Sequence, residues 1–163
     1  MDWVLAILLF LHVAGAVVAF GPTFAFPFIG AMGGKEPQHV NFALRLQELL
    51  STRLVLPLAL LQGVTGLLMV WRIGFDLLTR GWLLLAIALY LLALGNALLI
   101  LIPTGKRLVE ATSGPPPAPP AGAHAPSGPP PHIAALVARG KTFGMVNAAL
   151  IMAIIFLMVT KPF

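Results

Sequence analysis

Six polar side chains interrupt long apolar stretches of the sequence, and their types could support chemistry there. They are His12, Gln62, Thr65, Tyr90, Asn96 and Asn147. An apolar environment makes an unsatisfied polar group costly, so each is a candidate site residue. His12 has the widest chemistry, because an imidazole can ligate a haem iron, carry a proton or hydrogen-bond a quinone.

Four apolar stretches must position these side chains. They contain no Asp, Glu, Lys or Arg and cover roughly residues 3–30, 54–71, 81–103 and 142–160. About 20 apolar residues suffice to cross a bilayer as a helix. Hydrophobic residues make up 59% of the chain and charged residues 9%, against roughly a quarter charged in soluble domains. The sequence therefore predicts an all-α bundle of four transmembrane helices, forming one integral membrane domain over residues 1–163.

Helical rise places the polar residues in two layers across the membrane. The middle layer contains His12, Gln62, Thr65 and Tyr90. The inner layer contains Asn96 and Asn147, which we expect to hydrogen-bond to each other across the third and fourth helices. All six residues also suit a structural role, because polar side chains fasten neighbouring helices within membranes.

A haem site is the most specific chemical hypothesis for the middle layer. His12 is the only histidine within the four stretches, so one chain cannot provide two histidine ligands. Met152 lies near the same depth and is the candidate second ligand of a b-type haem, with Tyr90 as a further candidate cofactor contact.

The rest of the sequence argues against an enzyme. There is no cysteine, no acidic or lysine residue within the spans, and no HExxH or P-loop motif. Proton pumps and cation transporters usually need charged residues inside the membrane. The net charge of +5 reflects basic residues at helix ends and in loops, which is typical of membrane orientation and not of nucleic-acid binding.

The distribution of charge predicts that both termini lie outside the cytoplasm. Seven basic residues precede the second span or separate the third from the fourth, and three lie elsewhere. The larger group faces the cytoplasm by the positive-inside rule. Trp3, Trp71 and Trp82 would then share the outer interface, the level that tryptophan favours.

Three connecting features complete the organisation. Residues 114–131 include nine prolines and are expected to form a polyproline II or disordered cytoplasmic loop. Residues 38–52 are amphipathic, and form either a cytoplasmic extension of the second span or an interfacial helix. Pro22 predicts a kink or an early end of the first helix.

Short motifs along the four spans resemble a bacterial family of predicted four-helix integral membrane proteins of unknown function. The motifs are Leu11-His12-Val13-Ala14-Gly15, Arg53-Leu54 leading through Pro57 to Gly63 and Gly66, Gly81-Trp82-Leu83, and Met158-Val159-Thr160-Lys161-Pro162. The resemblance covers most of the chain outside the proline-rich loop. It implies a multi-pass protein of the bacterial inner membrane.

That family is distantly similar to copper-resistance protein D and to the membrane protoporphyrinogen oxidase family. In the oxidase, a first-span histidine is associated with b-type haem, and the resemblance gives this role to His12. The oxidase also depends on a basic residue in a later span. Here the third span offers only Tyr90 and Asn96.

Three hypotheses follow for the function. The leading one is a non-enzymatic accessory or structural subunit of a larger membrane assembly, with other membrane subunits or further copies of the chain as partners. The second is a haem-binding redox protein that uses His12, with Met152 or a ligand from another chain opposite. The third is a small transporter or copper-handling protein.

Overall fold

The computed structural model describes residues 2–76, 79–114 and 128–162, and these residues form helices without a β-strand. Four continuous helical rods are long and apolar enough to cross a membrane: Trp3–Lys35, Pro37–Ile73, Gly81–Ala111 and Pro131–Thr160. The predicted all-α fold with four long apolar helices is therefore confirmed.

The first rod is the single helix α1 (Trp3–Lys35). Asp2 caps its start, because the carboxylate accepts a hydrogen bond of 3.3 Å from the Leu5 N–H. The helix continues through Pro22 and Pro27, so the expected early end is wrong. Its 33 residues span about 50 Å, well beyond the roughly 30 Å of a hydrocarbon core.

The second rod joins four helical segments. They are the 3-10 turn η1 (Pro37–His39), helix α2 (Val40–Leu50), the π-helical turn η2 (Ser51–Val55) and helix α3 (Leu56–Ile73). The amphipathic segment at residues 38–52 therefore extends the second span, as the first of the two alternatives had it. The rod ends at Gly74, whose positive φ of 73° suits glycine as a helix cap.

The third and fourth rods complete the bundle. Helix α4 (Gly81–Asn96) passes through the π-helical turn η3 (Ala97–Leu101) into helix α5 (Ile102–Ala111), and α6 (Pro131–Thr160) returns. Both π-helical turns directly precede a segment with a proline at its second position, Pro57 or Pro103. Proline lacks the N–H that a regular turn needs, which accounts for the local widening. Most of the proline-rich tract, residues 115–127, lies outside the described residues.

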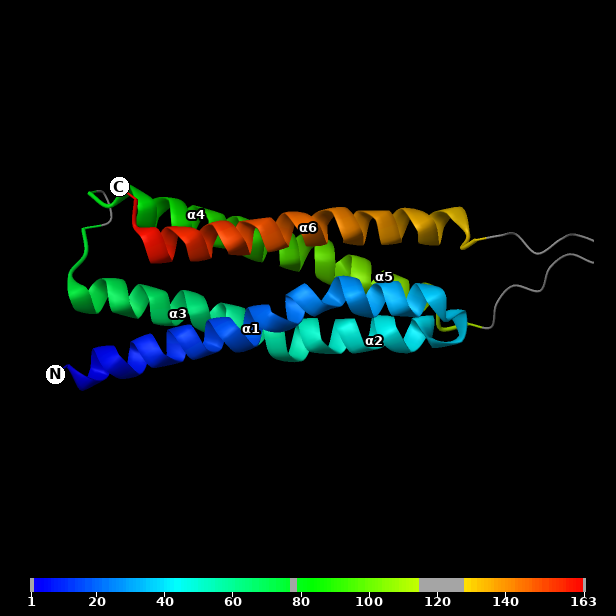
Figure 1. Cartoon of the computed structure of the whole chain (residues 1–163), viewed down its shortest axis with the longest axis horizontal. Coiled ribbons are helices and arrows are strands. Elements are labelled where there is room, and N and C mark those ends of the chain that lie inside the picture. Colours follow the sequence, from blue (N-terminus) through cyan, green and yellow to red (C-terminus); the bar gives the residue numbers. More distant parts are fainter. Residues whose placement is uncertain (1, 77–78, 115–127, 163) are drawn as a thin grey trace, which may run out of the picture.

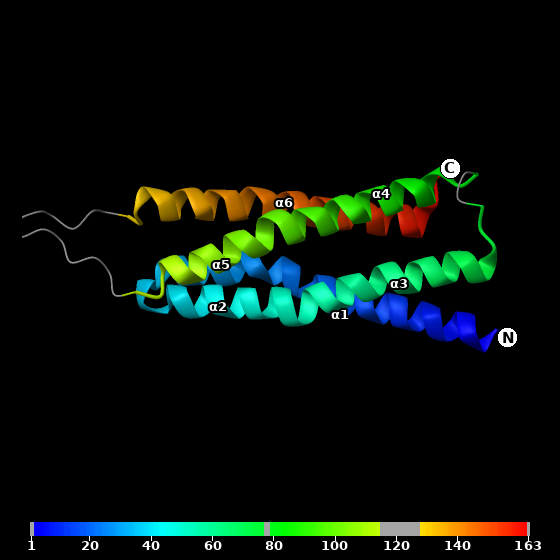
Figure 2. The same cartoon turned by 180° about the vertical axis from the view of Figure 1, so that it is seen from behind.

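The rods pair differently along the bundle (Figure 1). Towards the end that holds both termini, α1 packs against α3 and α4 packs against α6. Towards the other end, α2 and α5 pack against each other and join the remainder of α1 and α6, as the reverse view also shows (Figure 2). At the terminal end, Arg72 and Asp2 form an ion pair of 2.8 Å. Which end faces the cytoplasm remains the prediction made from the charges.

A cluster of buried apolar side chains lies near the terminal end, between α4 and α6. It contains Trp82, Leu83, Ala86 and Leu157. Trp82 is only 5% exposed and packs inside this cluster, whereas Trp3 and Trp71 are 69% and 79% exposed. All three tryptophans lie near helix ends at the terminal end of the bundle, so their shared interface level stays a prediction, but only Trp82 faces the protein interior. Its indole packs within the protein because its neighbours on α6 cover it.

Candidate functional site

The centre of the candidate site is a contact between α1 and α3. The Nδ1 atom of His12 lies 2.9 Å from the Thr65 hydroxyl oxygen. Thr65 is 2% exposed, and its hydroxyl also lies 2.8 Å from the Leu61 carbonyl oxygen one turn earlier. His12 is only partly buried. The contact therefore fastens a partly accessible imidazole to a fully enclosed hydroxyl.

Gly15 and Gly66 allow the two helices to approach at this level. A Cβ atom at Gly15 would lie 2.5 Å from the amide nitrogen of Gln62, and one at Gly66 would lie 3.3 Å from Cε1 of His12. Gln62 is 5% exposed, and its amide nitrogen has no hydrogen-bond partner among the described residues. The glycines thus admit the polar side chains into the helix interface, where Gln62 remains incompletely satisfied.

Tyr90 joins α4 to α3 beside this contact. Its hydroxyl donates a hydrogen bond of 3.0 Å to the Ala59 carbonyl oxygen. The ring covers Gly63, where a Cβ atom would lie 2.5 Å from the tyrosine oxygen. The tyrosine hydroxyl is therefore committed to the backbone of α3, which indicates a fastening role for a residue predicted as a cofactor contact.

The expected contact between the two asparagines is confirmed. The side-chain amide of Asn96 donates to the Asn147 side-chain oxygen at 3.2 Å and to the Phe143 carbonyl oxygen at 3.0 Å. The Asn96 side-chain oxygen is buried without a hydrogen-bond partner among the described residues. This inner layer ties α4 to α6, separately from the polar contacts of α3.

Met152 lies on the outside of the bundle. Its side chain is 54% exposed, whereas Ile151 beside it on α6 is 3% exposed. Adjacent residues of a helix point about 100° apart, so Ile151 takes the inward position. The structure thus gives Met152 an outward-facing position that does not suit a second ligand opposite His12 within one chain.

Two further polar contacts lie in the half of the bundle away from the termini, and the sequence did not single them out as fasteners. Asn41 on α2 donates to the Val109 carbonyl oxygen, within α5, at 3.2 Å. It also donates to the hydroxyl of Thr112, the residue that follows α5, at 2.9 Å. Gln47 donates to the Phe26 carbonyl oxygen at 2.9 Å. The amphipathic pattern of residues 38–52 was the available signal, but it did not indicate which surface this helix would contact.

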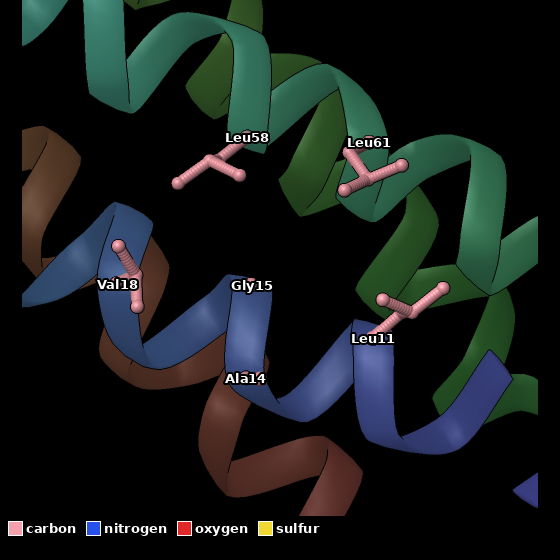
Figure 3. A pocket seen from close by; sticks show the side chains of 6 residues that line it. All are labelled: Leu11, Ala14, Gly15, Val18, Leu58 and Leu61. Atoms are coloured by element: carbon pink, nitrogen blue, oxygen red, sulfur yellow. The ribbon is translucent and has the colours of Figure 1, made fainter. Parts of the chain in front are cut away.

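Two apolar grooves open on the sides of the bundle. The first, of ≈ 190 Å³, runs between α1 and α3, where the side chains of Leu11, Val18, Leu58 and Leu61 surround Gly15 (Figure 3). The second, of ≈ 350 Å³, runs between α4 with η3 and α6. Neither groove is lined by His12 or Met152. Among the described residues, no three or more His, Asp or Glu side chains are grouped so that they could hold a metal ion.

The fold and these contacts define a four-helix integral membrane protein whose mid-membrane polar groups connect neighbouring helices. Residues 6–162 match the family model described as predicted integral membrane protein (DUF2269), and the chain belongs to that family. The family resemblance expected from the sequence is confirmed to this extent. No curated protein and no solved structure matches the chain.

Proposed function

We propose that this protein is a non-enzymatic accessory or structural subunit of a larger membrane assembly in the bacterial inner membrane. The supporting observation is that its mid-membrane hydrogen bonds join helix to helix. His12 contacts Thr65, Tyr90 donates to the backbone of α3, and Asn96 contacts α6. Such contacts stabilise a rigid scaffold, and each of them engages a polar atom of a side chain that could otherwise take part in chemistry.

The surface of the bundle suits this role. Large apolar side chains remain exposed along the bundle, among them Phe10, Val17, Leu99, Val146 and Phe156. Lipid or a neighbouring transmembrane helix would cover such side chains. In this proposal, part of the apolar surface packs against partner subunits, and both chain termini face away from the cytoplasm.

Native electrophoresis of the protein, extracted in a mild detergent after brief cross-linking in its own membrane, tests this function. We expect the chain to migrate in an assembly that contains other membrane proteins in fixed stoichiometry. Co-expression of two differently tagged copies distinguishes this from self-association, because only a homo-oligomer retains both tags. Migration as a lone monomer after cross-linking would contradict the proposal.

A specific contact supports a second candidate function, the binding of a b-type haem by His12. In the tautomer with its proton on Nδ1, the imidazole donates to the Thr65 oxygen while the threonine donates to the Leu61 carbonyl. The other ring nitrogen then keeps a free lone pair. In metal-binding histidines, the N–H of the second ring nitrogen commonly donates a hydrogen bond to an oxygen atom in this way. Because Met152 faces outward, another chain would supply the second ligand in this candidate.

Absorption spectra of the purified protein, oxidised and then reduced with dithionite, test whether it binds haem. Haem binding predicts a Soret band that is lost in His12→Ala and retained in His39→Ala, a control at an exposed histidine. A featureless visible spectrum of pure protein from its native membrane would contradict haem binding and leave His12 as a helix fastener.

A further inference from the structure

One of the two grooves has α4 and η3 on one side and α6 on the other, and its apolar lining and its length suit a lipid acyl chain. Its walls include Leu92, Leu99 and Ile100 on one side and Phe143, Val146 and Leu150 on the other. Leu99 is 77% exposed and Val146 is 44% exposed, so the groove opens to the surroundings of the bundle. From Leu150 to Phe143 it extends about 10 Å along α6, comparable to the roughly 15 Å of one leaflet's hydrocarbon layer.

Basic side chains continue the two walls at one end of this groove. Arg139 precedes Phe143 by four residues, which places both on the same face of α6. Arg107 follows Ile100 by seven residues, close to two helical turns, on α5. The two helices meet at this level, because a Cβ atom at Gly140 would lie 3.8 Å from the Thr104 side chain. Both arginines thus lie beyond the same end of the groove.

The charges of these arginines are available to a ligand. Arg107 and Arg139 are exposed, and neither forms an ion pair with a described residue. Lys106 and Lys141 stand beside them, also exposed. Glu110 is the single acidic residue of α5 and α6, and it lies a turn further from the groove. The end of the groove is therefore strongly basic, while its walls are almost entirely apolar.

We propose that this groove binds an anionic phospholipid, with an acyl chain between α4 and α6 and the phosphate at Arg107 and Arg139. Charge complementarity selects this occupant, because a neutral helix would leave the basic end unmatched. Arginine presents donors in a planar fork that fits phosphate oxygens. Basic residues at a membrane surface also attract anionic headgroups in general, so the test must separate this groove from diffuse attraction. The inference does not depend on the accessory-subunit proposal.

Native mass spectrometry of the full chain in a mild detergent measures the binding directly. Phosphatidylglycerol and phosphatidylcholine with identical acyl chains are added to the delipidated protein, and bound lipids are counted against concentration. We expect one phosphatidylglycerol to bind on the order of tenfold more tightly than phosphatidylcholine, since the basic residues attract its net negative headgroup. Equal affinity for both lipids would overturn the proposal.

Variants locate the site. The pair Arg107→Gln with Arg139→Gln should abolish the preference for the anionic lipid, and Val146→Trp should weaken binding of both lipids by filling the groove. The matched control is Arg45→Gln with Arg53→Gln, which removes the same charge from exposed positions on the second rod. An equal loss in this control would show diffuse attraction and overturn the proposal. Circular dichroism establishes that each variant keeps its helices.

Two other occupants are distinguished in the same experiment. Inorganic phosphate should fail to displace the bound lipid at comparable concentration, because it lacks the acyl chain that the groove holds. Displacement by phosphate alone would show that the site binds anions without requiring an acyl chain, and would contradict the proposal. A dimer in the wild-type spectrum that Val146→Trp converts to monomer would assign the groove to a second copy of the chain, and would equally overturn it.

Discussion

The His12 imidazole and the Thr65 hydroxyl, 53 positions apart in the sequence, lie 2.9 Å from each other between α1 and α3. Gly66 on α3 leaves room for the imidazole, and Gly15 on α1 leaves room for Gln62. Each helix therefore has a glycine opposite a polar side chain of the other helix, Gly66 opposite His12 and Gly15 opposite Gln62. The α1–α3 interface therefore contains polar side chains from both helices.

Removal of the Thr65 hydroxyl should weaken this interface. Thr65→Val retains the shape of the side chain, and we expect it to lower the free energy of unfolding by about 1 kcal/mol, the usual scale for a polar contact between membrane helices. Thermal unfolding in detergent, followed by intrinsic fluorescence, measures the change. Thr65→Ser should retain most of the stability because the hydroxyl remains.

Thr160→Val provides the matched control for that prediction. Thr160 is exposed, and the one hydrogen bond of its hydroxyl to a described residue is to the Phe156 carbonyl oxygen of its own helix, at 2.8 Å. The interhelical contact is isolated by a double-mutant cycle of Thr65→Val with His12→Leu, in which the combined loss should be smaller than the sum. Strict additivity of the two losses would show that His12 and Thr65 do not interact.

Gly63 should be intolerant of even a methyl group because Tyr90 covers it. A Cβ atom there would lie 2.5 Å from the tyrosine oxygen and 3.1 Å from the ring carbon that carries it. We expect Gly63→Ala to destabilise the protein by about 1–3 kcal/mol, the range for overpacking a filled interior. Adding Tyr90→Leu should recover part of this loss, again measured by thermal unfolding.

Gly144→Ala is the control for the Gly63 prediction. Gly144 also lies within a membrane-spanning helix, but apart from its own helical turn, no atom of the described residues lies within 4 Å of the position that its Cβ would take. It should leave the melting temperature unchanged or raise it slightly, since alanine favours helix. A comparable loss at both glycines would show that the contact with Tyr90 is not what makes Gly63 intolerant of a methyl group.

Asn41 should hold the end of α5 against α2. Its amide nitrogen donates to Thr112, Ser113 and the Val109 carbonyl oxygen, and these partners end the helix before the proline-rich tract. We expect Asn41→Ala to increase hydrogen exchange over residues 108–114 by several-fold, with little change in α3 or α6. Gln38→Ala, at an exposed position in η1, should leave the exchange unaltered. Unchanged hydrogen exchange in Asn41→Ala would show that Asn41 does not hold the end of α5 against α2.

The sequence by itself determined the class of protein. Four uncharged apolar stretches can only satisfy their backbone polar groups in a membrane as helices, so the all-α fold and the helix number followed from composition and length. The contact between Asn96 and Asn147 was also predictable, because regular helical rise fixes the depth of each residue.

Only the tertiary structure decided which faces of the helices meet. Depth along a helix follows from residue number, but rotation about its axis depends on packing with neighbours. This distinction explains why Met152, at the depth expected for a partner of His12, lies on the outer surface, and why Trp82 is buried whereas Trp3 and Trp71 are exposed. It also explains why Asn41 and Gln47 became fasteners: α2 continues α3 as one rod, and the bundle turns those side chains towards α5 and α1.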